Sequence, residues 1–133
     1  MKRRLARELV LKILFQIDLG KVDTALALET VLEEEDNTWI KEFVRSLVRG
    51  TEEHQEKIDQ LIEQYSKDWK LDRMAAVDRN LLRLAIYEIL YMPDIPSAVS
   101  INEAVELAKI YGSDESAKFV NGILGNLVRQ VNN

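Results

Sequence analysis

The sequence predicts an all-α fold, and three observations support this prediction. Apolar residues recur at spacings of three and four along nearly the whole chain, whereas the alternation typical of β-strands is absent. Five glycines and two prolines leave few places where a helix must end. The 133 residues, 47% of them hydrophobic, are enough to bury the core of one domain. We therefore expect a single helical domain that spans residues 1–133.

The first two predicted helices are separated by a short connection. The first helix covers about residues 3–19 and ends at Gly20. Its apolar stripe consists of Leu5, Ala6, Leu9, Val10, Ile13, Leu14 and Ile17. The second helix covers about residues 24–33, and the acidic run at 33–36 predicts a solvated connection behind it.

A long amphipathic segment follows at residues 39–65. Its apolar stripe has two halves, and Gly50 lies between them. At this glycine we expect either a bend or a close contact with another helix. His54, the one histidine, lies near the stripe and is interpreted as a packing or edge residue without a catalytic role.

The segment at residues 75–91 is the most apolar of the predicted helices, and a short helical turn precedes it at 69–74. A helix that is apolar nearly all round belongs at the centre of a fold. Its polar residues occupy a narrow sector, chiefly Arg79, Asn80 and Arg83. Pro93 and Pro96 bracket the loop that follows, because neither can continue the helix.

Capping signals mark the last two helices. Ser100 and Glu103 form a capping box, which places the start of the sixth helix at Ser100. Gly112 ends this helix, and Ser113 is expected to cap the seventh. Asn121 and Gly122 interrupt the apolar pattern of that seventh helix, so we expect a close approach there by another helix or by a ligand.

Positive charge is concentrated at the N-terminal end of an acidic chain. The net charge is −5, yet the first twelve residues carry five basic residues against Glu8 alone. Five residues fall opposite the apolar stripe of the first helix on a helical wheel, namely Arg4, Arg7, Leu11, Phe15 and Asp18. This face is either solvated, with its apolar side chains covered by another helix, or a nucleic-acid surface. In the second case cations neutralise phosphates and an aromatic ring stacks on an unpaired base.

Composition excludes several classes of chemistry. The chain has no cysteine, which rules out disulfides and thiolate ligands, and a single histidine rules out multi-histidine zinc sites. We expect no metal, no cofactor and no catalytic residue. No apolar run approaches the roughly 20 residues needed to cross a bilayer. The N-terminus lacks the pattern of a secretory signal, so we expect a cytoplasmic protein that does not bind membranes.

Four stretches of the sequence form a specific pattern. "INEAVELAK" (101–109) is followed by "FVNGIL" (119–124), and this pair resembles the NusB family of bacterial transcription antitermination factors. "RRLARELVLKILFQ" (3–16) is similar to the family's arginine-rich first helix, and "VDRNLLRLAIYEIL" (77–90) to its central helix. The resemblance covers nearly the whole chain in the same order, and is loose only in residues 20–65.

The resemblance implies both a fold and a function. The expected fold is NusB-like, with two small helical subdomains around one central apolar helix. The expected function is transcription antitermination. The protein would pair with the ribosomal protein NusE and bind the single-stranded boxA element of nascent ribosomal RNA. The pair would then help to assemble an antitermination complex on RNA polymerase and so support ribosomal RNA synthesis, without catalysis.

The resemblance also implies a set of site residues. Those expected to bind RNA are Lys2, Arg3, Arg4, Arg7, Phe15, Lys118, Phe119 and Asn121. Those expected to bind the partner protein are Glu88, Arg83 and Glu115. For Glu88 an exposed charge at the end of a buried helix is an equally good interpretation.

Two other functions are weighed against RNA binding. The chain could be a protein-binding helical scaffold or a homodimer that hides its first helix, with Leu11 and Phe15 in the contact. An enzyme is the weakest alternative. NusB-like domains occur fused to RNA methyltransferases, but this chain has no glycine-rich cofactor loop after a strand and no room for such a domain.

Overall fold

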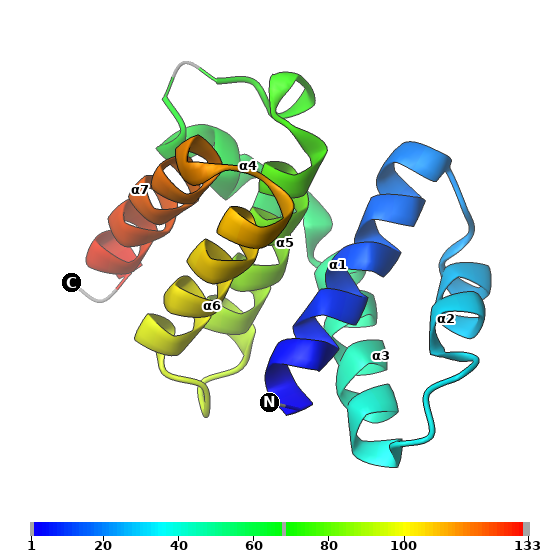
Figure 1. The fold of residues 1–133 in the computed structure, drawn as a ribbon. Helices are drawn as coiled ribbons and strands as arrows, with labels where there is room; N and C mark the ends of the chain where they lie inside the picture. The colour runs from blue at the N-terminus through cyan, green and yellow to red at the C-terminus, as the bar shows by residue number, and fades with distance from the viewer. Residues whose placement is uncertain (1, 68, 132–133) are drawn as a thin grey trace.

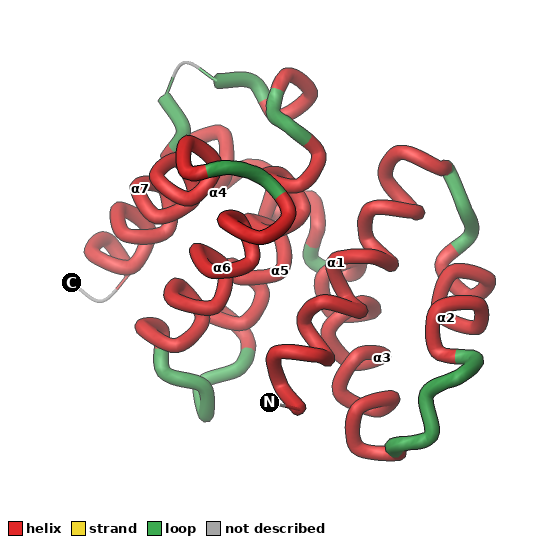
Figure 2. Tube along the Cα trace, in the orientation of Figure 1, coloured by secondary structure: helices red, strands yellow, loops and turns green. Residues whose placement is uncertain are grey.

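The computed structural model describes residues 2–67 and 69–131, and every regular element in this part of the chain is helical (Figures 1 and 2). The elements are α1 (Lys2–Gly20), α2 (Thr24–Leu32), α3 (Thr38–Glu53), α4 (Gln55–Tyr65), a 3-10 turn η1 (Leu71–Arg73), α5 (Ala76–Tyr91), α6 (Ser97–Tyr111) and α7 (Asp114–Val131). The all-α prediction is confirmed. None of these helices is both long enough and apolar enough to cross a membrane.

The helices pack as two groups that share α1 and α5. Helices α2 and α3 lie on one side of α1, and α4 to α7 lie on the other (Figure 1). One apolar cluster joins α1, α2 and α3 and includes Leu84 of α5. The other joins α4 to α7 and includes Leu11 of α1. The predicted pair of subdomains is confirmed, and α5 is the central helix, with Leu81, Leu82 and Ile86 fully buried.

The break in the long segment lies four residues beyond the predicted glycine. Helix α3 ends at Glu53 and α4 begins at Gln55, so the chain bends at His54. Gly50 instead allows a close helix contact, because a Cβ atom there would lie 2.2 Å from the Tyr87 ring. His54 stacks on the ring of Tyr91, with centroids 4.0 Å apart, as expected of a packing residue.

The predicted capping box of α6 is wrong. The helix begins at Ser97, directly after Pro96, so Ser100 already lies inside it. The side chains of Ser100 and Glu103 do not cap the helix, because each has a stronger charged partner on another helix. Ser100 donates to Glu88, and Glu103 accepts from Arg4. The cap of α7 is confirmed: Ser113 Oγ accepts the backbone N–H of Ser116 at 3.1 Å.

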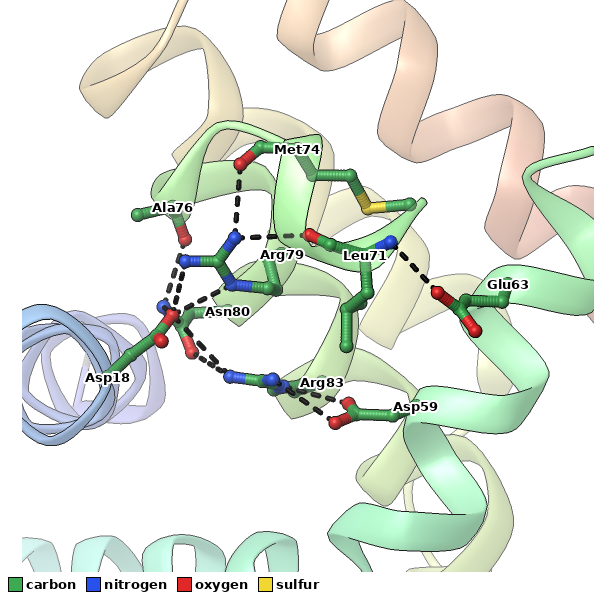
Figure 3. A network of polar contacts seen from close by, with 9 residues as sticks. All are labelled: Asp18, Asp59, Glu63, Leu71, Met74, Ala76, Arg79, Asn80 and Arg83. Atoms are coloured by element: carbon green, nitrogen blue, oxygen red, sulfur yellow. Dashed lines mark hydrogen bonds and ion pairs between the residues drawn. The ribbon is translucent and has the colours of Figure 1, made fainter. Parts of the chain in front are cut away.

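A polar network joins α5 to α1 and α4 (Figure 3). Arg79 and Asn80 both donate to Asp18, at 2.8 and 3.0 Å, while Arg83 donates to Asp59 at 2.9 and 3.1 Å. Burial alone would raise the pKa of Asp18, but the hydrogen bonds outweigh it, so its pKa lies below the usual range. The narrow polar sector of α5 therefore ties the two subdomains together.

Candidate nucleic-acid interface

The face of α1 that we expected opposite the core is largely an interior face. Arg7 is only 3% exposed and Leu11 only 5%. The reason is that α1 lies between the two subdomains, so a second set of helices covers the side opposite its main apolar stripe. The guanidinium of Arg7 donates to both carboxylate oxygens of Glu88 at 2.8 Å. The exposed position expected for Arg7 is therefore wrong.

The two central-helix residues expected to face the partner protein are also buried. Glu88 is 1% exposed and accepts the hydroxyl of Ser100 at 2.8 Å in addition to Arg7. Arg83 is buried between Asp59 and Asp18. The alternative interpretation of Glu88 as an exposed charge is therefore wrong, because its carboxylate is buried in an ion pair with Arg7.

Arg4 occupies the boundary between interior and surface. Its guanidinium donates to both oxygens of Glu103 on α6, at 2.6 and 2.8 Å, and a third of the side chain stays exposed. The hydrogen bond from Arg4 lowers the pKa of Glu103 below its usual range and raises that of Arg4. Arg4 therefore helps to hold α1 against α6, while one side of it remains open to solvent.

The remaining cations of α1 are exposed. Lys2, Arg3 and Lys12 all lie on the surface. The Arg3 guanidinium lies 5.9 Å from the ring centroids of both Trp39 and Phe43, which are themselves stacked 4.9 Å apart. Such a cation–π contact holds Arg3 in place and leaves its charge available. With the open side of Arg4, these three side chains are the positive charges that α1 offers to a ligand.

Phe15 lies in an apolar groove that is also bordered by one of these cations, Lys12. Its ring is 37% exposed, and the groove of about 610 Å³ also includes Lys12, Val77 and Tyr111. The Tyr111 hydroxyl donates to Glu8 at 2.8 Å, which closes one edge of the groove and raises the pKa of the phenol. An exposed aromatic ring with a lysine three residues away on the same helix can hold a base and a phosphate together.

A second hollow lies where α7 begins. Its aromatic walls are Trp69 and Phe119, whose rings meet edge to face with centroids 6.2 Å apart. Lys118 and Glu115 lie on its rim, and their charged atoms are 4.0 Å apart. This hollow and the Phe15 groove are neighbours. Asp78 of α5 and Ser113 line the hollow, whereas Val77 and Tyr111 line the groove.

The last two predicted positions lie further along α7. Asn121 is exposed and borders a separate groove between α6 and α7. A Cβ atom built on Gly122 would have no atom within 4 Å among the described residues, so the expected close approach of another helix is wrong. Lys118, Phe119, Asn121 and Glu115 thus share one end of α7 without meeting the cations of α1.

Sequence reasoning missed four residues of this surface. Lys12 could have been found, because it precedes Phe15 by three residues and shares its helical face. Trp69 is an exposed tryptophan in a loop, which is also a recognisable signal. Val77 and Tyr111 carry no such signal, since only the packing of α5 and α6 against α1 brings them to Phe15. Among the described residues no group of three or more acidic or histidine side chains converges as a metal site would.

Comparison with known proteins assigns this arrangement to a family. The model of the NusB family matches residues 4–129. The chain belongs to the NusB family. A transcription antitermination protein NusB from Desulforamulus reducens is 55% identical over 129 residues, which is 96% of this chain and 90% of that protein.

Solved NusB structures have the same fold as this chain. T. maritima NusB matches with a TM-score of 0.90 and 45% identity, over 96% of this chain and 90% of that one. A crystal structure of the antitermination factors NusB and NusE in complex with dsRNA contains a chain that matches with a TM-score of 0.89 and 29% identity. That match covers 97% of both chains. The family resemblance seen in the sequence is therefore confirmed across the length of the described chain.

Proposed function

We propose that this NusB-family chain is an RNA-binding adaptor in transcription antitermination. In this proposal it pairs with the ribosomal protein NusE and binds the single-stranded boxA element of nascent ribosomal RNA. The pair then helps to assemble an antitermination complex on RNA polymerase. The observation that carries the RNA-binding step is the groove on α1 where Lys12 lies beside the open ring of Phe15. Lys2 and Arg3 add exposed positive charge at the start of the same helix.

Charge and shape support RNA as the ligand of this part of α1. The chain carries a net charge of −5, so a local concentration of basic residues favours one orientation toward a polyanion and disfavours contact elsewhere. A ring that is more than one third exposed can stack on a base without rearrangement of the core. The solved NusB and NusE complex with dsRNA supports RNA and NusE together as ligands of this fold.

In this proposal the buried charged residues have a structural role. Arg7, Glu88 and Arg83 hold α1, α4, α5 and α6 together, and we propose that they act through this packing. Lys118 and Phe119 extend the RNA surface to the start of α7, and Asn121 lies beyond them on the exposed side of that helix. Glu115 is the only one of the three expected partner-binding residues that a partner could touch directly.

A homodimer through α1 is the second candidate. The exposed ring of Phe15 and its apolar groove favour it, because such surfaces also bind protein. Leu11, the other residue expected in that contact, is already covered by the chain's own core. A dimer would therefore rest on Phe15 and the rim of its groove.

Binding of a boxA-type RNA, with and without NusE, tests the proposal. A scrambled RNA of the same length is the control, and each titration is repeated at two salt concentrations. We expect tighter binding of the boxA-type RNA when NusE is present, with an affinity that falls as salt rises. Equal, weak binding of both RNAs in all conditions would contradict the proposal, and sedimentation of the free protein would then test the dimer.

A further inference from the structure

An acidic side chain lies beside Arg4, at a place where it would be expected to repel RNA. Glu103 belongs to the second turn of α6, and its side chain is 20% exposed. Ser100, Ala104 and Leu107 on the same helix are buried, so the carboxylate projects from an element that is fixed to the core. A negative charge next to a phosphate site weakens binding unless it contributes something else.

The contact between Arg4 and Glu103 occupies one side of the guanidinium. Arg4 Nε donates to Glu103 Oε1 at 2.6 Å, and Arg4 Nη2 donates to Oε2 at 2.8 Å. Both hydrogens of Nη1 and one hydrogen of Nη2 are left over, at the far end of the planar group. Among the described residues these hydrogens have no acceptor, and more than a third of the Arg4 side chain is exposed. The free end of Arg4 therefore remains a two-pronged donor.

The pair is ordered before any ligand binds. Two parallel hydrogen bonds between a guanidinium and a carboxylate fix the plane of the arginine. The hydrogen bond from Arg4 lowers the pKa of Glu103, so the carboxylate is ionised at neutral pH and the pair persists there. Arg7 Nη1 lies 3.7 Å from the same Oε1, which is beyond hydrogen-bond distance, so Arg4 is the main partner of Glu103.

Arg4 also lies on the same side of α1 as the aromatic ring of the proposed RNA surface. Phe15 follows Arg4 by about three helical turns, or about 16 Å along the helix axis. Helix α6 runs beside α1 over this distance, since Glu103 contacts Arg4 and Tyr111 contacts Glu8. A strand that stacks a base on Phe15 can thus place a phosphate a few nucleotides away at Arg4.

We propose that Glu103 is a positioning residue for RNA binding, which holds the Arg4 guanidinium so that its free Nη1 and Nη2 hydrogens point at one phosphate. This inference rests on the proposed RNA-binding function and adds to it a residue that does not itself touch RNA. Arginine suits this task because its planar group can bind a carboxylate on one side and a phosphate on the other, whereas a lysine presents a single point charge.

The gain and the cost of this arrangement are both identifiable. The gain is that Arg4 loses its side-chain freedom in the free protein and not on binding. The cost is repulsion between the Glu103 carboxylate and the phosphate. A phosphate at the far end of the guanidinium is further from Glu103 than from Arg4, and physiological salt screens the longer interaction more strongly.

The RNA affinity of Glu103→Gln tests the positioning role, with the full chain, NusE and a boxA-type RNA. Glutamine keeps the shape but turns an N–H donor toward Arg4, so the two-pronged contact is lost. We expect binding about two- to ten-fold weaker, because Arg4 must then be ordered on binding. The slope of log affinity against log salt should fall by less than the roughly 0.7 lost in Arg4→Ala, since the phosphate contact still forms.

Glu106→Gln is the matched control on the same helix. Glu106 attracts Arg4 through space only and lies 3.7 Å from Lys109, so its removal deletes the same charge without breaking a hydrogen bond to Arg4. This variant should bind RNA as the parent protein does, or slightly more tightly. The opposite signs of the two changes separate positioning from simple charge repulsion.

A double variant separates positioning from a structural role. Arg4→Ala with Glu103→Gln should bind no more weakly than Arg4→Ala alone, because Glu103 acts through Arg4. Urea denaturation of each variant gives the folded fraction to which the affinities refer. Equal or tighter binding by Glu103→Gln, or an additive loss in the double variant, would overturn the positioning role and leave the proposed function standing. No binding of the boxA-type RNA by the parent protein, even with NusE, would remove both.

Discussion

Helix α1 carries two sets of charges that serve different purposes. Arg7 and Asp18 face inward and pair with Glu88 and Arg79 of α5. Lys12 and the residues at the N-terminal end face outward. The two sets alternate along one helix, so the number of basic residues in a stretch says little about their function. What decides the function is which side of the helix a second subdomain covers.

The inward set also fixes how α1 and α5 lie. Arg7 near the start of α1 meets Glu88 near the end of α5, and Asp18 near the end of α1 meets Arg79 near the start of α5. The two helices are therefore antiparallel. A basic residue near the start of a helix and an acidic residue near its end both interact unfavourably with the helix dipole. The ion pairs between α1 and α5 offset this unfavourable interaction at both ends of the two helices.

We expect the largest effect on stability when the inward-facing ion pair of Arg7 with Glu88 is removed. Arg7→Ala leaves the Glu88 carboxylate buried without its charged partner, which costs about 3–5 kcal/mol of unfolding free energy. Urea denaturation followed by circular dichroism measures this loss. Arg3→Ala, at the exposed start of the same helix, is the matched control and should lower stability by no more than about 1 kcal/mol, the value of its cation–π contact. Equal stability of the two variants would show that the inward pair is not structural.

The next largest effect concerns the aromatic ring of the outward set. Phe15→Ala should weaken RNA binding by about 1–3 kcal/mol through the loss of stacking. Its cost in stability should stay below the roughly 3–5 kcal/mol of a fully buried phenylalanine, because the ring is partly exposed. Phe15→Tyr keeps the ring and should bind RNA as the parent does. If Phe15→Ala destabilises the fold but the folded fraction binds RNA normally, stacking is refuted.

Removal of one outward cation should have a smaller effect. Lys12→Ala should lower the slope of log affinity against log salt by about 0.7, the value for one phosphate contact with a single strand. The loss should be similar for boxA-type and scrambled RNA, because a phosphate contact reads no sequence. Lys57→Ala on α4 removes an exposed lysine that lines neither hollow and is the control. An unchanged slope for Lys12→Ala would exclude this residue from the interface.

The smallest expected effect is a dependence of stability on pH at the boundary between the two sets. The bond from Arg4 lowers the pKa of Glu103 in the folded protein below its ordinary value of 4.5. The resulting stability is complete above that value and is lost as the pH falls through the lowered pKa. Because Arg4 is partly exposed, we expect less than about 1 kcal/mol. Glu103→Gln should flatten this part of the pH profile measured by denaturation, and an identical profile would contradict the assignment.

The sequence was sufficient to predict the helices, because their apolar stripes have a strong period. It was also sufficient to place α5 at the centre, since a helix that is apolar on nearly all sides has no solvent face. It could not show that α1 is covered on two sides. Periodicity identified the main stripe with Val10 and Ile13, but Leu11 on the opposite face belongs to the second cluster.

The same limit explains the errors in the candidate site. Arginine on the side opposite an apolar stripe is normally exposed, and only the approach of Glu88 from a helix 81 positions away buries Arg7. The capping box failed for a related reason, because Ser100 and Glu103 were assigned to each other by spacing alone. Local sequence patterns predict contacts within one helix, whereas these side chains form hydrogen bonds between helices.

The most direct test of this division of charges is the RNA affinity of the double variant Arg7→Leu with Glu88→Leu. Replacing both partners of a buried ion pair by apolar residues avoids an unpaired charge and often preserves the fold. We predict that the folded double variant binds boxA-type RNA with the affinity and salt dependence of the parent protein, because the Arg7 guanidinium is buried against Glu88. A loss of affinity together with a decrease of about 0.7 in the salt slope would contradict the account and place Arg7 among the phosphate contacts.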